Sequence, residues 1–156
     1  MSGLCPDCNK PNTGHHWCQH CNSKRFQQNF NKWTSGNELI DKFIQDAQLK
    51  ARKYYEVTEW IPYNRFRNIQ YLAQGGFSIV YKAIWLDRYI KEWDREKQQW
   101  KRYTIGLINN DYEIAKQENV KSPLNESEKY GLHVVLKSLN NSSNIHEDFL
   151  NEVNYF

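Results

Sequence analysis

The chain has 156 residues, of which 39% are hydrophobic, 25% charged and 15% aromatic, and its formal net charge is +3. This composition excludes a disordered chain, and the length excludes a multidomain enzyme, because compact domains usually have about 100 to 150 residues. No apolar run approaches the ~20 residues that cross a membrane, and the N-terminus lacks the apolar stretch of a signal peptide. We therefore expect an intracellular, cytoplasmic protein with no membrane partner.

All four cysteines lie near the N-terminus, in two Cys-x2-Cys pairs. Two residues between ligands let a tight turn bring both sulfurs to one Zn²⁺ at ~2.3 Å, and two such turns complete a tetrahedron. The alternatives are idle thiols or disulfides, and a reducing compartment disfavours disulfides. Because four thiolates leave no open position for water, we predict a structural zinc site and not a catalytic one. Its ligands would be Cys5, Cys8, Cys18 and Cys21.

An asparagine follows each cysteine pair, at Asn9 and Asn22. We expect each to close its turn in a left-handed backbone conformation, which asparagine tolerates better than most residues. Three histidines in the same region could replace one sulfur, but the four cysteines suffice, so we predict surface positions for His15, His16 and His20.

The charge of the N-terminal segment argues against nucleic acid as a partner. A zinc ion with four thiolates carries a charge of −2, which offsets most of the basic excess there. Single-stranded nucleic-acid binding through Lys24, Arg25 and Trp33 is therefore the weakest of the hypotheses.

The segments after the cysteines predict one long helix and then strands. Residues 26–33 have the composition of a polar connector, and apolar residues at helical spacing predict an amphipathic helix over 37–54. From 69 to 85, β-branched and aromatic residues flank Gly75-Gly76, which predicts a hairpin.

The rest of the chain predicts more strands and a final helix. Residues 89–103 favour a strand pair that turns at 94–97. Residues 104–129 are rich in Asn, Lys and Glu, which predicts a surface insertion that acts as structural slack. A strand is expected over 131–139 and a helix over 145–156.

Three segments in the second half carry motifs that occur together in one family. Leu-Ala-Gln-Gly-Gly-Phe-Ser-Ile-Val begins at Leu72, His-Val-Val-Leu-Lys ends at Lys137, and Phe-Leu-Asn-Glu-Val contains Glu152. In order and spacing they resemble the glycine-rich loop, the third strand and the C-helix of the eukaryotic protein kinase small lobe. The whole chain is similar to kinase-like proteins expanded in some fungi, which have a four-cysteine module before the lobe.

The resemblance implies an ATP site. Leu72, Val80 and Val135 would line the adenine, Gly75, Gly76, Phe77 and Ser78 would cover the phosphates, Lys137 would bind them, and Glu152 would hold Lys137. The chain departs from the family pattern at Ala73 and Ser78, where glycine is usual, and at Val135, where alanine is usual.

The residues also make chemical sense without the family. A Gly-Gly hairpin tip exposes backbone N–H groups to which phosphates can come close. Strand alternation places Val135 and Lys137 on one face, so an apolar residue can contact a base while the ammonium reaches the phosphates. Helical spacing places Glu152 on the buried side of its predicted helix, where a carboxylate needs a cation such as Lys137.

These observations predict an α+β chain with three parts. A four-cysteine zinc module spans 1–25, a helical linker spans 26–65, and an incomplete protein kinase-like small lobe spans 66–156, with an insertion at about 86–129. The first hypothesis is a protein kinase-like ATP-binding region. Because the sequence lacks the catalytic Asp and the Mg²⁺-binding Asp and Asn of the family, we expect a truncated and inactive form. The alternative is a non-enzymatic adaptor whose zinc module binds a protein partner.

Overall fold

The computed structural model describes residues 3–76, 78–104, 121–126, 128 and 131–139. The fold is α+β with antiparallel sheets. It divides into two compact units, of which unit 1 contains residues up to 60 and 90–102, and unit 2 contains 61–89 and the described residues from 103 onward. Within these residues, no helix combines the length and the apolar character that crossing a membrane requires. The predicted helix at 145–156, with Glu152, and Phe77 lie outside the described residues.

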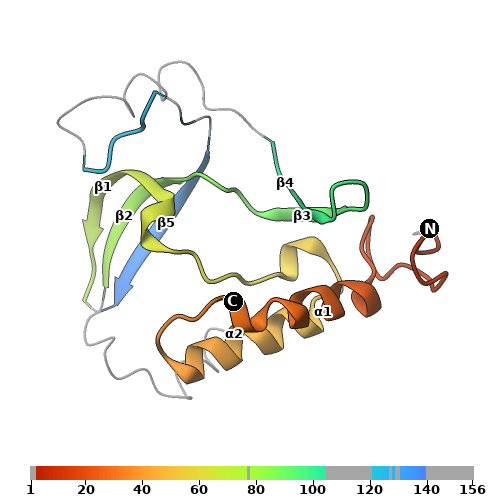
Figure 1. The fold of residues 1–156 in the computed structure, drawn as a ribbon. Helices are drawn as coiled ribbons and strands as arrows, with labels where there is room; N and C mark the ends of the chain where they lie inside the picture. The colour runs from red at the N-terminus through yellow and green to blue at the C-terminus, as the bar shows by residue number, and fades with distance from the viewer. Residues whose placement is uncertain (1–2, 77, 105–120, 127, 129–130, 140–156) are drawn as a thin grey trace. The chain divides into compact units, whose positions relative to one another are not determined.

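Unit 1 contains two packed helices, α1 (Gln19–Gln28) and α2 (Glu38–Lys50), with a 3-10 turn, η1 (Phe30–Lys32), between them (Figure 1). The side chain of Asn37 caps α2 by accepting hydrogen bonds from two backbone N–H groups of its first turn, at 2.9 and 3.2 Å. The predicted helix at 37–54 is therefore confirmed, although it ends four residues early. The predicted connector at 26–33 is wrong, because α1 runs to Gln28 and Phe26 is buried.

The early end of α2 has a tertiary cause. Side chains from the cysteine region donate hydrogen bonds to three backbone carbonyls at this end: Gln19 to Leu49 at 3.2 Å, Trp17 to Ala51 at 2.9 Å, and Thr13 to Arg52 at 2.8 Å. A helix end leaves its last carbonyls without partners inside the helix, so these donors stabilise a stop at this position. A second 3-10 turn, η2 (Tyr54–Glu56), follows the stop.

The hairpin predicted at 89–103 is confirmed and belongs to unit 1. Strand β3 (Ile90–Asp94) pairs with β4 (Gln99–Arg102), and the Asp94 carboxylate accepts two backbone N–H groups of the turn, both at 3.0 Å. Trp100 of β4 stacks on Trp17 at 5.6 Å and on Phe26 at 4.6 Å between ring centroids. With Ala51 and Ile90, these rings form the hydrophobic core of the unit.

Unit 2 is a three-stranded antiparallel sheet in the order β1-β2-β5 (Figure 1). The strands are β1 (Phe66–Gln74), β2 (Ser78–Trp85) and β5 (Leu132–Leu139), so the predicted Gly-Gly hairpin and the predicted strand at 131–139 are both confirmed. A 3-10 turn, η3 (Tyr63–Arg65), precedes β1. The core residues of this sheet are Phe66, Ile69, Ala83 and Trp85, with Tyr81, Leu132, Val134 and Leu136 packed against them.

The described part of the predicted insertion at 104–129 pairs with β1 and packs against the sheet, so it is not a loose surface segment. The backbone N–H groups of Asn68 and Ile69 in β1 donate to the carbonyls of Ser122 and Lys121, at 2.5 and 3.0 Å. Leu124 is buried against Ile84, with 4% of its surface exposed. Residues 121–124 therefore provide hydrogen-bond partners for backbone groups at the edge of β1. The low apolar content of this segment does not predict this pairing.

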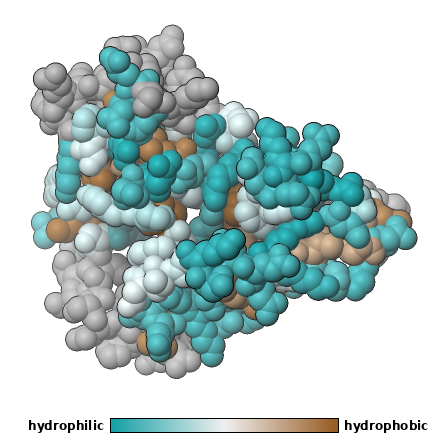
Figure 2. All heavy atoms as spheres, viewed as in Figure 1, coloured by the Kyte–Doolittle hydropathy of each residue, from teal (hydrophilic) through white to brown (hydrophobic). Residues whose placement is uncertain are grey.

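The two units group the chain differently from the predicted segments 1–25, 26–65 and 66–156. Residues 26–60 belong to the same compact unit as the cysteine region. The hairpin at 90–102, which was predicted as part of the insertion, belongs to this unit too. The surface in Figure 2 is mostly hydrophilic over the described residues, with hydrophobic residues in separate patches.

Candidate metal centre

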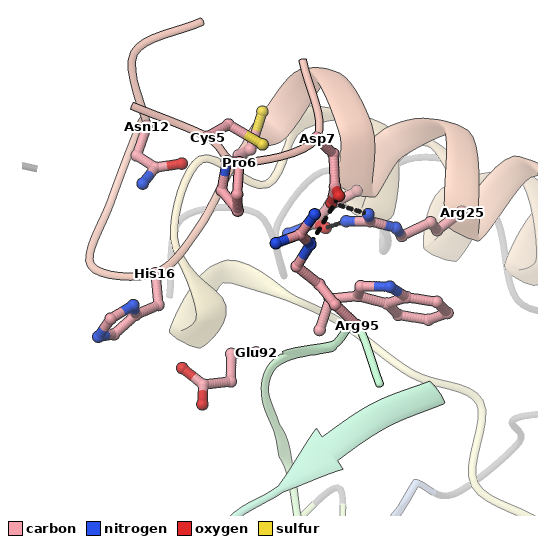
Figure 3. A pocket seen from close by; sticks show the side chains of 11 residues that line it. Cys5, Pro6, Asp7, Asn12, His16, Arg25, Glu92 and Arg95 are labelled. Carbon is pink, nitrogen blue, oxygen red and sulfur yellow. Dashed lines mark hydrogen bonds and ion pairs between the residues drawn. The ribbon is translucent and has the colours of Figure 1, made fainter. Parts of the chain in front are cut away.

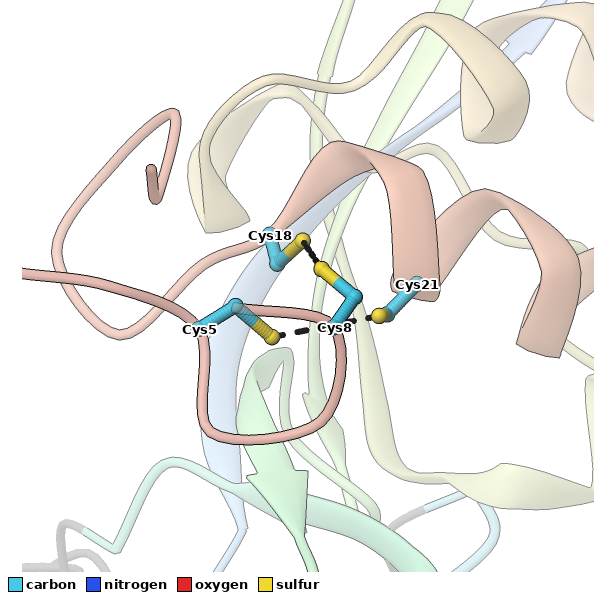
Figure 4. Close-up of side chains that lie close together, drawn as sticks. All are labelled: Cys5, Cys8, Cys18 and Cys21. Carbon is cyan, nitrogen blue, oxygen red and sulfur yellow. Dashed lines mark hydrogen bonds between the residues drawn. The ribbon is translucent and has the colours of Figure 1, made fainter. Parts of the chain in front are cut away.

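The four cysteine thiols form one cluster in unit 1 (Figure 4). The Sγ atoms of Cys5 and Cys21 are 3.8 Å apart, those of Cys8 and Cys18 are 3.7 Å apart, and all four lie within 4.8 Å of one another. A tetrahedral zinc–thiolate site with bonds of ~2.3 Å has sulfur–sulfur edges of about 3.8 Å. The pairs are too far apart for disulfides, whose bond is about 2.05 Å, and all four cysteines are free. The cluster is therefore compatible with a metal ion such as zinc.

The first cysteine pair sits in a tight turn of the predicted kind. The Cys5 carbonyl accepts the Asn9 N–H at 2.8 Å, and the Cys5 N–H donates to the Lys10 carbonyl at 2.7 Å. Asn9 has a φ of 59°, so its predicted left-handed conformation is confirmed.

The second pair is built differently, because Cys18 is the N-cap of α1 and Cys21 lies in its first turn. Asn22 is consequently helical and only 2% exposed, and its side-chain oxygen accepts a hydrogen bond from Arg25 at 2.7 Å. The predicted left-handed Asn22 is wrong, since the helix continues through this position. One pair is thus held by a turn and the other by a helix start.

The thiols differ in their electrostatic environments. A hydrogen bond from the backbone N–H of Lys10 lowers the pKa of Cys8 to about 7, whereas burial raises the pKa of Cys18 and raises that of Cys21 to about 12. Four clustered thiolates repel one another, so the fully ionised set needs a cation among them. A divalent metal supplies that charge and releases protons from the thiols as it binds.

None of the three predicted surface histidines belongs to the thiol cluster. The ring of His20 lies between two lysines, with its nitrogens 3.5 Å from Lys10 Nζ and 3.2 Å from Lys24 Nζ. The positive charges of Lys10 and Lys24 lower the pKa of this imidazole. The donor set in the described chain is therefore sulfur alone.

Asp7, between the first two cysteines, ties their turn to two other elements (Figure 3). One carboxylate oxygen accepts from Arg25 of α1 at 2.5 Å and the other from Arg95 of the β3–β4 turn at 2.8 Å. These hydrogen bonds, that of Arg25 first among them, hold the pKa of Asp7 below its ordinary value. No sequence pattern indicates this role, although Asp7 is the single acidic residue in the first 33 positions.

The predicted nucleotide-site residues in the described chain lie in unit 2. Val80 is directly opposite Lys137 in the β2–β5 pairing, and Lys82 is opposite Val135, which places all four on one face of the sheet. Val135 is 58% exposed and Leu72 is 53% exposed. Ser78 begins β2.

The two glycines of the hairpin have ample space. A Cβ added at Gly75 would have one neighbour, at 4.0 Å, and one added at Gly76 would have none within 4 Å. Neither glycine has a positive φ that would require it. In the described residues, neither the contacts nor the backbone conformation requires glycine at these two positions.

Comparison with known proteins supplies no relative. No family model, curated protein or solved structure matches this chain. The assignment of function therefore depends on the geometry of the two units.

Proposed function

We propose that unit 1 is a zinc-stabilised interaction module that binds an acidic segment of a protein partner. The observation that carries the proposal is the cluster of four free thiols within 4.8 Å, which no other side chain of the described residues joins as a donor. Four thiolates complete a tetrahedral coordination sphere and leave no position for water or substrate, so the metal would hold the fold and not perform chemistry. The function of the unit then lies on its surface.

The charge of one cavity supports an acidic partner. Between α1 and the β3–β4 hairpin, a cavity of about 590 Å³ has Lys24, Arg25 and Lys32 as its charged lining residues. Arg25 is engaged by Asp7 and stacks over Trp93 at 4.6 Å, and Lys24 Nζ contacts a ring nitrogen of His20 at 3.2 Å. The remaining N–H groups of Lys24 and the ammonium of Lys32 would meet the ligand. Two cations beside tryptophan rings suit carboxylates on an extended peptide.

A labelled ten-residue peptide of alternating Asp and Glu tests this proposal by fluorescence anisotropy. We expect K24E/K32E to weaken binding at least tenfold, and raised salt to weaken binding of the wild type. K42E/K50E on α2 is the matched control with the same net charge change, and it should bind like the wild type. If both double variants lose the same amount of affinity, the effect comes from net charge alone, and the proposal is contradicted. If a labelled single-stranded oligonucleotide binds more tightly than the acidic peptide, the partner is nucleic acid and not an acidic protein segment.

The identity of the bound metal is tested by a separate measurement. The purified chain should hold one zinc per molecule by elemental analysis, and a C5S/C8S double variant should hold none. Iron also accepts four thiolates, so it is the alternative metal for this site. Bound iron in place of zinc would contradict the proposal.

We propose, as a second function, that the exposed face of the β1-β2-β5 sheet binds a nucleotide such as ATP. Two observations favour it: Val80 and Lys137 are directly opposite each other, and no contact among the described residues requires glycine at positions 75 and 76. Absent side chains would let phosphates approach the backbone N–H groups, while the Lys137 ammonium balances their charge. The resemblance to the protein kinase small lobe assigns the same roles, and the proposal is limited to binding.

The melting temperature of the chain with Mg²⁺ and ATP tests nucleotide binding. Ligand at 100 times its Kd stabilises the folded state by about 2.7 kcal/mol, which shifts the melting temperature by several degrees. We expect K137M to abolish the shift and K82M, on the same face but farther from the tip, to retain it. An unchanged melting temperature of the wild type with ATP would contradict this function.

A further inference from the structure

Three exposed side chains of unit 1 form a basic cluster, to which the first cysteine turn contributes Lys10 and α1 contributes His20 and Lys24. The Lys10 Nζ atom is 3.5 Å from Nδ1 of His20, and the Lys24 Nζ atom is 3.2 Å from Nε2 of the same ring. Lys10 and His20 also line a surface cavity of about 510 Å³, whose described lining residues include no carboxylate. The cluster is therefore open to a ligand from solvent.

The two contacts of His20 conflict chemically. A neutral imidazole has one N–H group and one accepting nitrogen, and an ammonium group can only donate. One lysine can donate to the accepting nitrogen, but the other lysine then faces the N–H group of the ring, whichever tautomer is present. If the imidazole is protonated, both contacts bring two donors together. The three groups therefore lack a shared acceptor within the described chain.

The two lysines of the cluster also have no anionic partner among the described residues. Neither ammonium forms an ion pair with a carboxylate, whereas Arg25 and Arg95 both pair with Asp7. Neither ammonium donates to a cysteine sulfur, so the charge of the thiol cluster is not paired with them directly. Two like charges against one ring repel each other, and an anion between them would remove this repulsion.

The backbone places the three residues before any ligand binds. The Lys10 carbonyl accepts from the Cys5 N–H at 2.7 Å, and the Lys10 N–H donates to the Cys8 sulfur, which fixes Lys10 in the cysteine turn. His20 and Lys24 are four residues apart on α1, so they lie on one face of the helix. Binding then needs only small side-chain rotations, which lowers its entropic cost.

The number of donors and their charge favour a phosphate monoester. At pH 7 this group carries a charge of about −1.5 to −2 and has three acceptor oxygens. It can thus balance two ammonium groups and accept from the imidazole N–H at the same time. A carboxylate has a single charge and two oxygens, so it leaves part of the cluster unsatisfied. Lysine is also a common phosphate-binding residue.

We propose that Lys10, His20 and Lys24 form a binding site for the phosphate group of a phosphate monoester. A phosphorylated side chain of a protein and a free phosphate ester share this chemistry. The inference goes beyond the acidic partner of unit 1, because Lys10 and His20 do not line the cavity that contains Lys32, and only Lys24 belongs to both sites.

Two acetylated Gly-X-Gly amides, with phosphoserine or aspartate as the central residue, test the proposal on the full chain as purified. Titrations followed by ¹H–¹⁵N NMR should give a Kd for the phosphoserine peptide at least tenfold below that for the aspartate peptide. We expect K10M to weaken binding of the phosphoserine peptide at least fivefold. K42M on α2 makes the same change of charge and should bind like the wild type.

Three outcomes would overturn the proposal. The first is equal binding of the phosphoserine and aspartate peptides by the wild type, a comparison that stands even if K10M fails to fold. The second is a K10M variant that loses metal but retains phosphoserine binding, since Lys10 would then be a counter-charge of the thiol cluster. The third is a loss in K32M as large as that in K10M, which would place the phosphate in the cavity of the acidic partner.

A titration with ethyl phosphate distinguishes the two sources of the phosphate group. Tighter binding of the phosphoserine peptide than of ethyl phosphate supports the site with a phosphorylated protein as its ligand. Equal or tighter binding of ethyl phosphate supports the site with a free phosphate ester. The wild-type comparison of peptides does not depend on the K24E/K32E variant, so failure of the acidic-partner proposal and failure of this one are distinguishable.

Discussion

In unit 1 the hydrophobic core joins residues from three distant parts of the sequence, whereas in unit 2 it comes mainly from three strands of one sheet. Trp17, Phe26, Ala51 and Ile90 meet in the first core, beside a cluster of four thiols. The second is organised by continuous strand pairing over β1, β2 and β5. The difference indicates that metal and long-range contacts stabilise unit 1, while strand register and cross-strand packing stabilise unit 2.

The largest expected effect is the loss of unit 1 on removal of the metal. Metal binding is worth about 10 to 16 kcal/mol in zinc-finger peptides, more than a small core supplies. With a strong chelator, or in C5S/C8S, we expect amide protection to disappear in α1 and α2 but to persist in β2. Hydrogen exchange followed by NMR measures both. H20A is the control, because His20 lies outside the thiol cluster. Equal loss of protection in the two units would contradict separate stabilisation.

The next effect should come from Trp100, whose ring stacks on Trp17 and Phe26. We expect W100A to lower the free energy of unfolding of unit 1 by about 2 to 4 kcal/mol, near the range for truncated core aromatics. Denaturant unfolding with probes in each unit measures this change. K97A, in the exposed turn of the same hairpin, should change it by less than about 0.5 kcal/mol. A Trp100 variant as stable as the wild type would show that the hairpin is not part of the core.

A smaller effect, confined to unit 2, is expected at Gly131. A Cβ at this position would overlap Ile84 Cγ2 and lie 2.7 Å from the Trp85 carbonyl oxygen. We expect G131A to destabilise the sheet by about 1 to 3 kcal/mol through overpacking. G76A is the matched control, because a Cβ there has no neighbour within 4 Å. Thermal unfolding of the two variants should separate them, and similar melting temperatures would contradict the tight packing of Gly131.

The smallest effect concerns Asp41, which accepts hydrogen bonds from Ser35 and Thr34 just before α2. These bonds, that from Ser35 first, lower the pKa of Asp41 below 3.8 in the folded state. A lowered folded pKa contributes stability above the unfolded pKa, and this is lost only as the pH falls through the folded value. D41N should therefore melt slightly below the wild type by the same amount at every pH from 6 to 8. Below that range the difference should shrink as the pH falls toward the folded pKa, and a difference that grows on acidification would contradict the pKa direction.

Local patterns in the sequence were sufficient for several elements. The hairpin around Gly75-Gly76, the strand pair turning at 94–97 and the start of α2 follow from residues that are neighbours in the chain. The same is true of the cysteine cluster, because a Cys-x2-Cys turn brings its two sulfurs together locally. The kinase-like roles of Lys137 and Glu152 stay predictions, and Glu152 lies outside the described residues.

Other features could not be read from local patterns. Helix α1 has few apolar residues, so its periodicity is weak, and its buried Phe26 packs against Trp17 and Trp100. The buried position of Leu124 depends on contacts with a strand 40 residues earlier in the sequence, at Ile84. In both cases tertiary partners override a polar local composition.

By itself, the sequence determined the four metal-ligand candidates, the strand pattern and the exclusion of a disordered chain, because spacing and alternation act over a few residues. Only the tertiary structure decided that the hairpin at 90–102 shares a unit with the cysteines and that α2 ends where Thr13, Trp17 and Gln19 meet its carbonyls. It also decided that Gln48 is buried, with its amide nitrogen donating to the Thr58 carbonyl. These contacts join residues far apart in the chain, and their energies depend on packing that no local pattern encodes.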